Sequence, residues 1–358
     1  MKVGLVGCGN ISQIYLQNAA TMFRNIEIIK CADLKKDAAQ KCAEKWGIEA
    51  VSIDNLLADK EIEIVLNLTT PQSHVEIDLA ALQFSKHVYA EKPFAIDMES
   101  AAKVIKLAEE KKLRVGSAPD TFLGSAHQTC RKMIDSNLIG KVMSGVAFMM
   151  CPGHESWHPS PGFYYLQGGG PLFDMGPYYI TALVNMLGKV KRVCAINNRA
   201  TNLRQGYGVN ENTTFPVEVD THVSAILEFE NSAVVNLICS FDVQKHSNYR
   251  EIELYGTEGS LHVPDPNNFG GEIRFFKKGL TKNWADAQDS LPYNTNSRAL
   301  GLADMIDAIE NNREHRCNGK IAYHVLEVMC GIIESGKCGR SIDIQSSCSR
   351  PEVLDKKF

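Results

Sequence analysis

The chain has no Cys-x-x-Cys pair, no run of about 18 apolar residues and no surplus of basic residues. Without such an apolar run we expect no membrane-spanning helix. The opening segment MKVGLVGCGN also lacks the apolar core of a secretion signal. The formal net charge of -4 argues against a nucleic-acid-binding surface. We therefore expect a cytoplasmic protein that binds neither nucleic acid nor membranes.

The eleven cysteines are odd in number and scattered along the chain. Several of them stand in apolar segments, including Cys31, Cys194 and Cys239. This distribution favours reduced, buried thiols over a framework of disulfides. No ligand spacing supports a zinc site, so we predict no metal site.

A chain of 358 residues is long enough for two domains of roughly 100–200 residues each. Over residues 1–120, short apolar runs alternate with amphipathic stretches, which predicts a parallel sheet whose strands are connected by helices. The predicted strands are KVGLVG, IEIIKCAD, EIVLNLT, HVYAEKP and LRVGSA. We predict an α/β fold, with Asp97 as the N-cap of the helix that begins at DMESA.

The pattern changes in residues 121–358, which we assign to a second domain. Its predicted elements are a helix near 126–136, a strand near 142–150, a loop over 151–170, a helix from about Pro177, helices near 298–312 and 320–336, and a last strand SIDI. Six β-type runs between 190 and 277 predict a large, mostly antiparallel open sheet, and hence an α+β domain. The last helices could also pack back on the first domain.

The segment VGLVGCGNIS reads as a strand, a Gly-x-Gly turn and the start of a helix. Gly7 would allow the tight turn, and Gly9 would let a pyrophosphate approach the backbone. A helix that starts near Asn10 and Ile11 would direct its N–H groups at the phosphates. Ser12 stands where a third glycine is usual. These features predict a Rossmann domain that binds a dinucleotide, and the alternative is a tight turn without a ligand.

Asp33 ends the second predicted strand, where a carboxylate can accept the hydroxyl groups of the adenosine ribose. It would also repel the 2′-phosphate of NADP, because two unit charges 4 Å apart interact by about 4 kcal/mol at an effective dielectric constant of 20. Lys35 could offset this repulsion by pairing with the phosphate. We favour NAD over NADP, and Asp33 could also cap the following helix.

Three segments together resemble the Gfo/Idh/MocA oxidoreductases: VGCGNIS, AEKP at 90–93 and GGGPLFDMGPYY at 168–179. The resemblance extends along the whole chain. It implies a Rossmann domain followed by a domain with an open sheet, assembled as a homodimer or homotetramer. It also implies NAD(P)-dependent oxidation or reduction of a CH–OH carbon in a sugar, cyclitol or related polyol.

Lys92 follows a predicted strand at the end where open α/β sheets bind ligands. Its ammonium could hydrogen-bond the reacting hydroxyl and stabilise an alkoxide. To act as a base, Lys92 needs a pKa that falls from about 10.4 toward 7–8. Burial and the oxidised nicotinamide would both act in that direction. Glu91 could orient Lys92 or the cofactor, and the alternative is a surface pair at a turn.

The resemblance further implies an aspartate with a histidine four residues later. Asp174 is present, but the later position holds Tyr178. Tyrosine has a pKa near 10, so Tyr178 needs a cation such as Lys92 to move a proton, and otherwise only hydrogen-bonds the substrate or packs. His154 or His158 could replace the missing histidine. Asp174 could equally be the N-cap of its helix.

The loop HESWHPSPGFYY supplies hydrogen-bonding and stacking groups of the kind that line a sugar pocket. The predicted substrate residues are His154, Trp157, His158, Tyr165 and Tyr179. The alternative for this loop is packing at a subunit interface.

The segment NLTTPQSHVEI resembles the stretch after the fourth strand in this family. The resemblance implies that Thr69, Thr70 and Pro71 lie against the ribose on the nicotinamide side. For His74 the alternatives are a contact with the cofactor and packing or capping within its own helix.

The leading hypothesis is an NAD(P)-dependent dehydrogenase in which a substrate hydroxyl lies between Lys92 and Tyr178. One alternative is a relative that cleaves glycosides through transient oxidation by bound NAD. Another is a non-catalytic protein that senses a cofactor or a sugar. The presence of Glu91, Lys92 and Asp174 argues against a sensor, since binding alone needs no acid–base groups.

Overall fold

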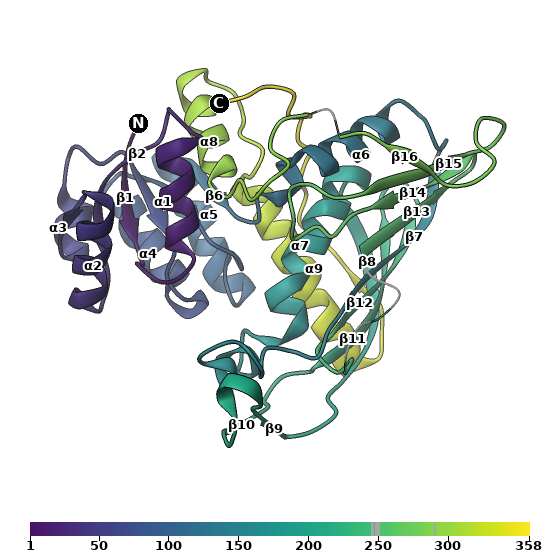
Figure 1. The fold of residues 1–358 in the computed structure, drawn as a ribbon, viewed down its shortest axis with the longest axis horizontal. Helices are drawn as coiled ribbons and strands as arrows, with labels where there is room; N and C mark the ends of the chain where they lie inside the picture. The colour runs from purple at the N-terminus through teal and green to yellow at the C-terminus, as the bar shows by residue number, and fades with distance from the viewer. Residues whose placement is uncertain (245–246, 248–250, 290) are drawn as a thin grey trace. The chain divides into compact units, whose positions relative to one another are not determined.

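We analysed a computed structural model, which describes residues 1–244, 247, 251–289 and 291–358 (Figure 1). The chain forms two compact units. The first comprises Met1–Gly124, Thr295–Leu326 and Leu354–Phe358, and the second comprises Ser125–Asn294 and Glu327–Val353. Helix α9 (Gly319–Cys338) passes from the first unit into the second. Within the described ranges, every helix is too short or too polar to cross a membrane.

The first unit contains a six-stranded, fully parallel sheet. Its strands are β1 (Lys2–Val6), β2 (Glu27–Ala32), β3 (Glu49–Ala50), β4 (Ile64–Asn67), β5 (His87–Ala90) and β6 (Val115–Ser117). The order β3-β2-β1-β4-β5-β6 is that of a doubly wound dinucleotide-binding domain. The predicted α/β fold is thus confirmed. Among its strands, β3 was not predicted, because two residues are too few to show a period.

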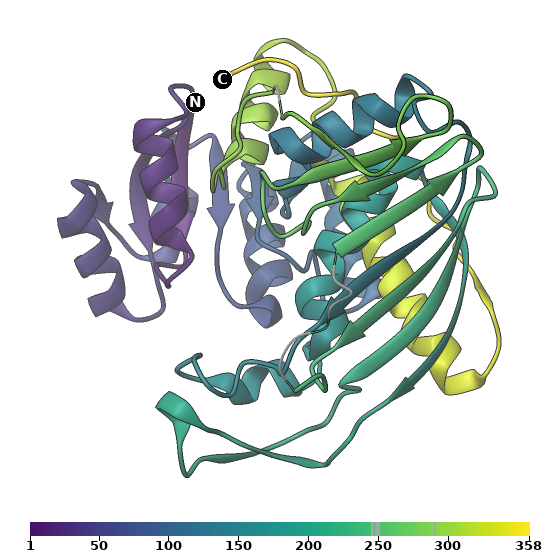
Figure 2. The same ribbon diagram turned by 45° about the vertical axis from the view of Figure 1, so that its right-hand side comes forward.

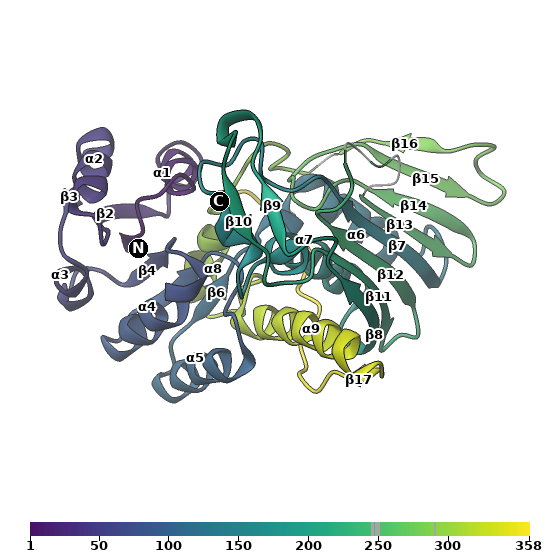
Figure 3. The same ribbon diagram turned by 90° about the horizontal axis from the view of Figure 1, so that it is seen from below.

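Helices cover both faces of this sheet. They are α1 (Ser12–Thr21), α2 (Lys36–Trp46), α3 (Ile53–Ala58), α4 (Pro71–Gln83), α5 (Met98–Lys111) and α8 (Leu300–Glu310). Figure 3 shows α1 and α2 on one side of the strands and α4 and α5 on the other. Every residue of β4 is buried, as expected for a strand covered on both faces. Asp97 caps α5 as predicted, accepting the backbone N–H of Ser100 at 2.8 Å.

The second unit contains a nine-stranded sheet of order β16-β15-β14-β13-β7-β12-β11-β8-β17 (Figure 2). Its strands are β7 (Val142–Met150), β8 (Val190–Asn198), β11 (His222–Phe229), β12 (Val234–Ser240), β13 (Glu251–Gly256), β14 (Gly259–Val263), β15 (Ile273–Lys277), β16 (Ala285–Ala287) and β17 (Ile342–Asp343). Strands β7 and β12 pair in parallel, and the other pairs are antiparallel. This confirms the prediction of a large, mostly antiparallel sheet.

One face of this sheet is covered by α6 (Ser125–Asp135), α7 (Gly170–Leu187) and the last part of α9 (Figure 3). Burial alternates along the strands as a result: Leu227 of β11 is fully buried, whereas Ile226 beside it is 47% exposed. Cys194 of β8 is exposed, so the prediction that it is a buried thiol was wrong. Cys31 and Cys239 are buried as predicted, and all eleven cysteines are free.

Helix α7 begins at Gly170, so the prediction of a helix from about Pro177 was wrong. Pro171 occupies the first turn, where a missing N–H costs no helical hydrogen bond. Pro177 lies inside the helix and removes one such bond. Most of α7 is buried, including Leu172 and Leu183, and this apolar burial offsets the loss.

A further two-stranded sheet, β9 (Leu203–Gln205) with β10 (Thr214–Pro216), was not predicted. Its strands have three residues each, and the polar segment around them shows no clear alternation. This small sheet holds part of the candidate site of the second unit.

Candidate functional site

The turn after β1 needs glycine at its first position. Gly7 has a φ of +98°, and a Cβ placed on it would lie 2.5 Å from the carbonyl oxygen of Leu68. The Gly7 N–H donates to the Ala32 carbonyl at 2.9 Å, which ties the turn to the end of β2. A side chain at Gly7 would therefore push β1 away from the residues after β4.

The start of α1 presents an open surface beside this turn. A Cβ on Gly9 would meet no atom within 4 Å, and no side chain caps the helix. Because α1 begins at Ser12, Asn10 and Ile11 lie in the turn itself. The buried Ser12 hydroxyl donates to the Gly9 carbonyl at 2.7 Å, so the residue in place of the third glycine braces the turn. An uncapped helix start next to open backbone suits a phosphate group.

Asp33 follows β2 and is half-buried. One carboxylate oxygen accepts the N–H of Cys8 and the other accepts the N–H of Lys35, both at 2.8 Å. Lys35 occupies the N-cap position of α2, so the reading of Asp33 as that cap was wrong. Each carboxylate oxygen has a second lone pair, which leaves capacity for the hydroxyl groups of a ribose.

The turn after β4 is organised by Asn67, a residue that the sequence analysis missed. Its side chain accepts from the Thr69 hydroxyl at 2.7 Å and donates to the carboxyl of Asp78 at 2.7 Å. Burial raises the pKa of Asp78 to about 7. The signal for Asn67 in the sequence is a polar residue within an apolar strand. Its buried hydrogen bonds hold Thr69 in place. Of the other predicted cofactor residues in this segment, Thr70 is exposed and Pro71 begins α4.

His74 connects two turns of the first unit. It is fully buried, with Nδ1 2.8 Å from the Pro93 carbonyl and Nε2 3.1 Å from the Thr69 carbonyl. Burial lowers its pKa. Because both ring nitrogens face backbone oxygens, no ring nitrogen remains for the predicted cofactor contact. His74 instead acts as a positioning residue that holds the Thr69 turn against the segment after β5.

Glu91 and Lys92 lie at the carboxyl end of β5. Glu91 is 8% exposed and accepts the hydroxyl of Tyr15 at 2.8 Å and the backbone N–H of Lys92 at 2.9 Å. The two residues are therefore more than a surface pair, since Glu91 connects helix α1 to the backbone of Lys92. Burial raises the pKa of Tyr15 well above 10, so Tyr15 remains a hydrogen-bond donor.

In the second unit, His154 lies against Asp174 with Nε2 2.9 Å from Oδ2. Both side chains are nearly buried, at 11% and 12% exposed. Asp174 projects from the second turn of α7, so the reading of Asp174 as an N-cap was wrong. An imidazole therefore lies next to Asp174, carried by the loop before α7, while position 178 holds tyrosine.

Aromatic rings surround this pair. The His154 ring lies 4.0 Å from that of Tyr164 and 5.1 Å from that of Trp157, between centroids. Trp157 is 59% exposed, and His158, whose pKa is lowered by burial, is half-buried beside Tyr164 at 5.1 Å. Trp157 and His158 therefore remain able to contact a ligand.

Three tyrosines lie deeper than predicted. Tyr165 is fully buried under the guanidinium of Arg204, 5.0 Å from the ring centroid, which contradicts its assignment to the substrate. Tyr179 is 3% exposed and donates to the Phe148 carbonyl at 3.3 Å, so it too belongs to the core. Tyr178, one turn after Asp174, is 6% exposed. Its predicted role stays a prediction.

Arg204 of β9 holds the loop that carries His154, and the sequence analysis missed it. Its guanidinium pairs with Glu155 at 2.5 Å, with Asp242, and with the Pro152 carbonyl at 3.2 Å. Glu155 is 2% exposed and Arg204 is 9% exposed. A buried arginine next to two carboxylates fixes backbone that has no regular secondary structure. The polar context of β9 gave no signal for this role.

These observations fit NAD in the first unit. The Gly7 turn, the open backbone at Gly9, the uncapped α1 and the Asp33 carboxylate are the features that bind a pyrophosphate and an adenosine ribose.

Among the described residues, the group of donors close enough to share a metal ion is formed by Cys8, Cys31 and Cys42.

Comparison with known families agrees with this assignment. Residues 1–118 match the model of an oxidoreductase family with an NAD-binding Rossmann fold, and residues 127–262 match the Gfo/Idh/MocA C-terminal domain. The chain belongs to the Gfo/Idh/MocA oxidoreductase family, and its first unit is the NAD-binding domain of that family.

The individual relatives share only part of the amino-acid sequence with this chain. The chain is 32% identical over 114 residues to an inositol 2-dehydrogenase of Salmonella typhimurium, covering 31% of this chain and 34% of that protein. It is 24% identical over 249 residues to a levoglucosan dehydrogenase of Pseudarthrobacter phenanthrenivorans, covering 64% and 63%. A solved levoglucosan dehydrogenase in complex with NADH and L-sorbose superposes with a TM-score of 0.84 at 19% identity, covering 97% and 99%.

Proposed function

We propose that the chain is an NAD-dependent dehydrogenase that acts on a CH–OH carbon of a sugar or polyol. The observation that carries the proposal is the contact between His154 and Asp174, 2.9 Å apart and nearly buried. A family member that had lost its chemistry would have no need to keep an imidazole beside this carboxylate. Distant relatives of the chain are named as inositol and levoglucosan dehydrogenases, which supports the substrate class.

In the proposed chemistry, His154 and Asp174 together take the proton of the substrate hydroxyl. Asp174 accepts the Nε2–H of His154 and so fixes the imidazole in the tautomer whose Nδ1 is a base. Nδ1 then takes the proton of the substrate hydroxyl. When bound, NAD accepts the hydride that leaves the same carbon. This arrangement removes the need for Tyr178 to ionise, because the imidazole of His154 and not the phenol takes the proton.

Lys92 is proposed as the group that stabilises the developing alkoxide. Its backbone is fixed through Glu91, which keeps the residue at the carboxyl end of β5. Lys92→Ala tests this role: it should lower turnover by about 10²–10³-fold, the usual effect of losing one group that stabilises an oxyanion, while NAD binding stays nearly normal.

The aromatic loop is proposed to bind the carbohydrate. Trp157 is exposed and can stack on the apolar face of a sugar ring, and His158 can hydrogen-bond a hydroxyl. Assembly as a homodimer or homotetramer and a cytoplasmic location stay predictions. Within this proposal the cofactor is NAD, with NADP less favoured because of Asp33.

The test is formation of NADH in a panel of sugars, cyclitols, polyols, sugar acids and glycosides, with NAD and NADP in parallel. We expect turnover with one compound class and a preference for NAD. Release of free sugar from a glycoside without net NADH would overturn the proposal in favour of a glycoside-cleaving enzyme. Binding of NAD without turnover of any compound would favour a sensor.

Variants of the second unit test the proton assignment. His154→Gln should lower kcat by about 10²–10⁴-fold, the usual contribution of a positioned base, with NAD affinity unchanged. Tyr178→Phe should lower kcat much less. His222→Gln, on strand β11, is the matched control and should leave kcat unchanged. A larger fall in kcat for Tyr178→Phe than for His154→Gln would instead assign the proton transfer to Tyr178.

A further inference from the structure

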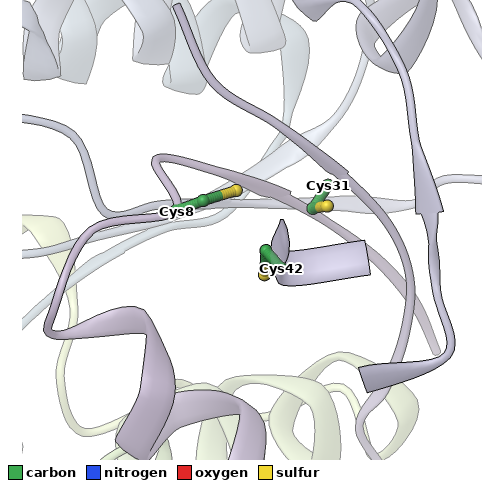
Figure 4. A group of neighbouring side chains, drawn as sticks. All are labelled: Cys8, Cys31 and Cys42. Atoms are coloured by element: carbon green, nitrogen blue, oxygen red, sulfur yellow. The ribbon is translucent and has the colours of Figure 1, made fainter. Parts of the chain in front are cut away.

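We propose that Cys8, Cys31 and Cys42 form a three-sulfur site for a soft divalent metal ion such as Zn²⁺. The three Sγ atoms lie within 4.8 Å of one another. They come from three separate elements, namely the turn after β1, strand β2 and helix α2 (Figure 4). The proposed redox chemistry of the chain uses none of these thiols.

The distances suit a shared ion. Zinc binds thiolate at about 2.3 Å, so two ligands of a tetrahedral ion lie about 3.8 Å apart. The three sulfurs therefore need to move inward by at most about an ångström, which side-chain rotation provides. The contacts that such a movement would break are weak, because the Sγ atoms of Cys8 and Cys31 lie 3.6 Å and 3.4 Å from the carbonyl oxygens of Ala32 and Ala39.

The surroundings hold the donors in place. Cys31 is fully buried in β2, and Cys42 is 3% exposed in α2. Cys8 is half-buried, and its position is fixed by the bond from its N–H to Asp33. Two donors on regular elements and one on a braced turn give a preorganised site, with the half-buried Cys8 as its solvent side.

The donor set selects the class of ion. Three sulfurs without a carboxylate or imidazole exclude hard ions such as Mg²⁺ and Ca²⁺, which need oxygen. Three thiolates with a divalent ion carry a net charge of -1, whereas a monovalent ion would leave -2 beside the carboxylate of Asp33. The divalent ion is therefore favoured, with water as its fourth ligand on the side of Cys8.

The site was not visible in the sequence, where the three cysteines are far apart and form no ligand motif. The parallel pairing of β1 with β2 and the return of α2 over β2 bring them together. Rules based on the spacing of zinc ligands along the chain detect sites formed by one local loop. They do not detect this group, because the pairing of strands in the sheet brings its cysteines together.

The experiment is a titration of the reduced, chelator-treated full chain with Cd²⁺, followed by competition with Zn²⁺. We expect thiolate-to-cadmium absorbance in the near ultraviolet that saturates at one ion per chain and is displaced by Zn²⁺. Cys8→Ser and Cys42→Ser should each weaken binding at least about tenfold, the effect of losing one ligand. Cys194→Ser, which replaces an exposed thiol on β8, is the control and should bind as the unchanged chain does.

Circular dichroism and urea unfolding show whether each variant is folded, and Cys42→Ala serves where the serine variant is not. Absence of the absorbance, equal affinity in the control and the cluster variants, or binding of Cu⁺ without Cd²⁺ or Zn²⁺ would each overturn the proposal. So would loss of two cluster thiols on removal of the reductant in a chain that binds no ion, because that result assigns the cluster to a disulfide.

Discussion

The two units build their candidate sites from different materials. In the first, turns at the carboxyl ends of parallel strands are held mainly by backbone geometry, as at Gly7 with its positive φ. In the second, His154 stands on a long loop that is held by side chains, chiefly Arg204 and Glu155. A backbone-held turn leaves its mark in the sequence as an obligatory glycine. A loop held by ion pairs leaves no local mark, because its partners come from distant segments.

The contrast extends to the groups behind each site. In the first unit, buried Asn67 bonds to a carbonyl of helix α4, and buried His74 bonds to a carbonyl of the segment after β5. In the second, Arg204 reaches two carboxylates and two carbonyl groups from a strand of three residues. Substitutions should therefore disrupt the first site mainly by straining the backbone, and the second site mainly by removing a partner of an ion pair.

The largest effect is expected from Gly7→Ala. The added Cβ would lie 2.5 Å from the Leu68 carbonyl oxygen at a φ of +98°, and neither backbone segment can move freely. We expect a loss of about 3–5 kcal/mol in the free energy of unfolding and no measurable NAD binding. Urea unfolding and calorimetric NAD titration provide the measurements.

Gly9→Ala is the matched control for this substitution, since its Cβ meets no atom within 4 Å. Its free energy of unfolding should be unchanged, while NAD binds more weakly because the methyl group occupies the space proposed for the pyrophosphate. Equal destabilisation by both substitutions would show that the turn is not held by its backbone.

Arg204→Met should be the most damaging change in the second unit. It leaves Glu155 unpaired at 2% exposure, and removal of one partner from a buried ion pair costs about 3–5 kcal/mol. We expect a lower unfolding midpoint and a higher KM for the substrate, with NAD affinity nearly normal. Arg192→Met removes a half-exposed pair with Glu228 and should cost less than about 1 kcal/mol. Similar losses in both variants would refute the role given to Arg204.

The pH dependence of stability tests the buried network behind Thr69. Burial raises the pKa of Asp78 to about 7, whereas an unfolded aspartate has a pKa of about 3.9. The stabilising contribution of protonated Asp78 is complete below about pH 4 and is lost as the pH rises through 7. Asp78→Asn keeps an acceptor for Asn67 and has no proton to lose. It should therefore be about 2–4 kcal/mol more stable than the unchanged chain at pH 8.

Urea unfolding at pH 5 and pH 8 measures this difference, and the exposed Asp54→Asn is the control. A difference between Asp78→Asn and the unchanged chain that does not grow with pH would show that Asp78 ionises in the folded state without cost.

The smallest effect is expected from Asp33→Asn. The amide keeps one acceptor, for the Cys8 N–H, but loses the bond from the Lys35 N–H and the charge that would repel a 2′-phosphate. The preference for NAD over NADP, measured as a ratio of dissociation constants, should fall about tenfold, which corresponds to about 1.4 kcal/mol. The exposed Asp37→Asn changes the net charge of the same unit equally and should leave the ratio within about twofold. An unchanged ratio in Asp33→Asn would remove Asp33 from cofactor selection.

Local patterns were sufficient for most elements of the fold. Five of the six strands in the first sheet could be predicted, because buried parallel strands are continuous apolar runs between helices. The predicted start of α7 near Pro177 was wrong because proline usually stands in the first turn of a helix, whereas the buried α7 tolerates Pro177 in its interior. Strands β9 and β10 are too short for a period to appear.

Positions whose chemistry is local could be identified from the amino-acid sequence. The Gly7 turn and the Lys92 strand end are encoded by neighbours in the chain, because φ angles and strand ends depend on adjacent residues. The contact of His154 with Asp174, the hold of Arg204 on the loop of His154, and the burial of Tyr165 and Tyr179 depend on the three-dimensional packing. These contacts join residues that are separated along the chain, and their partners are chosen by the packing of the sheet and helices rather than by sequence spacing.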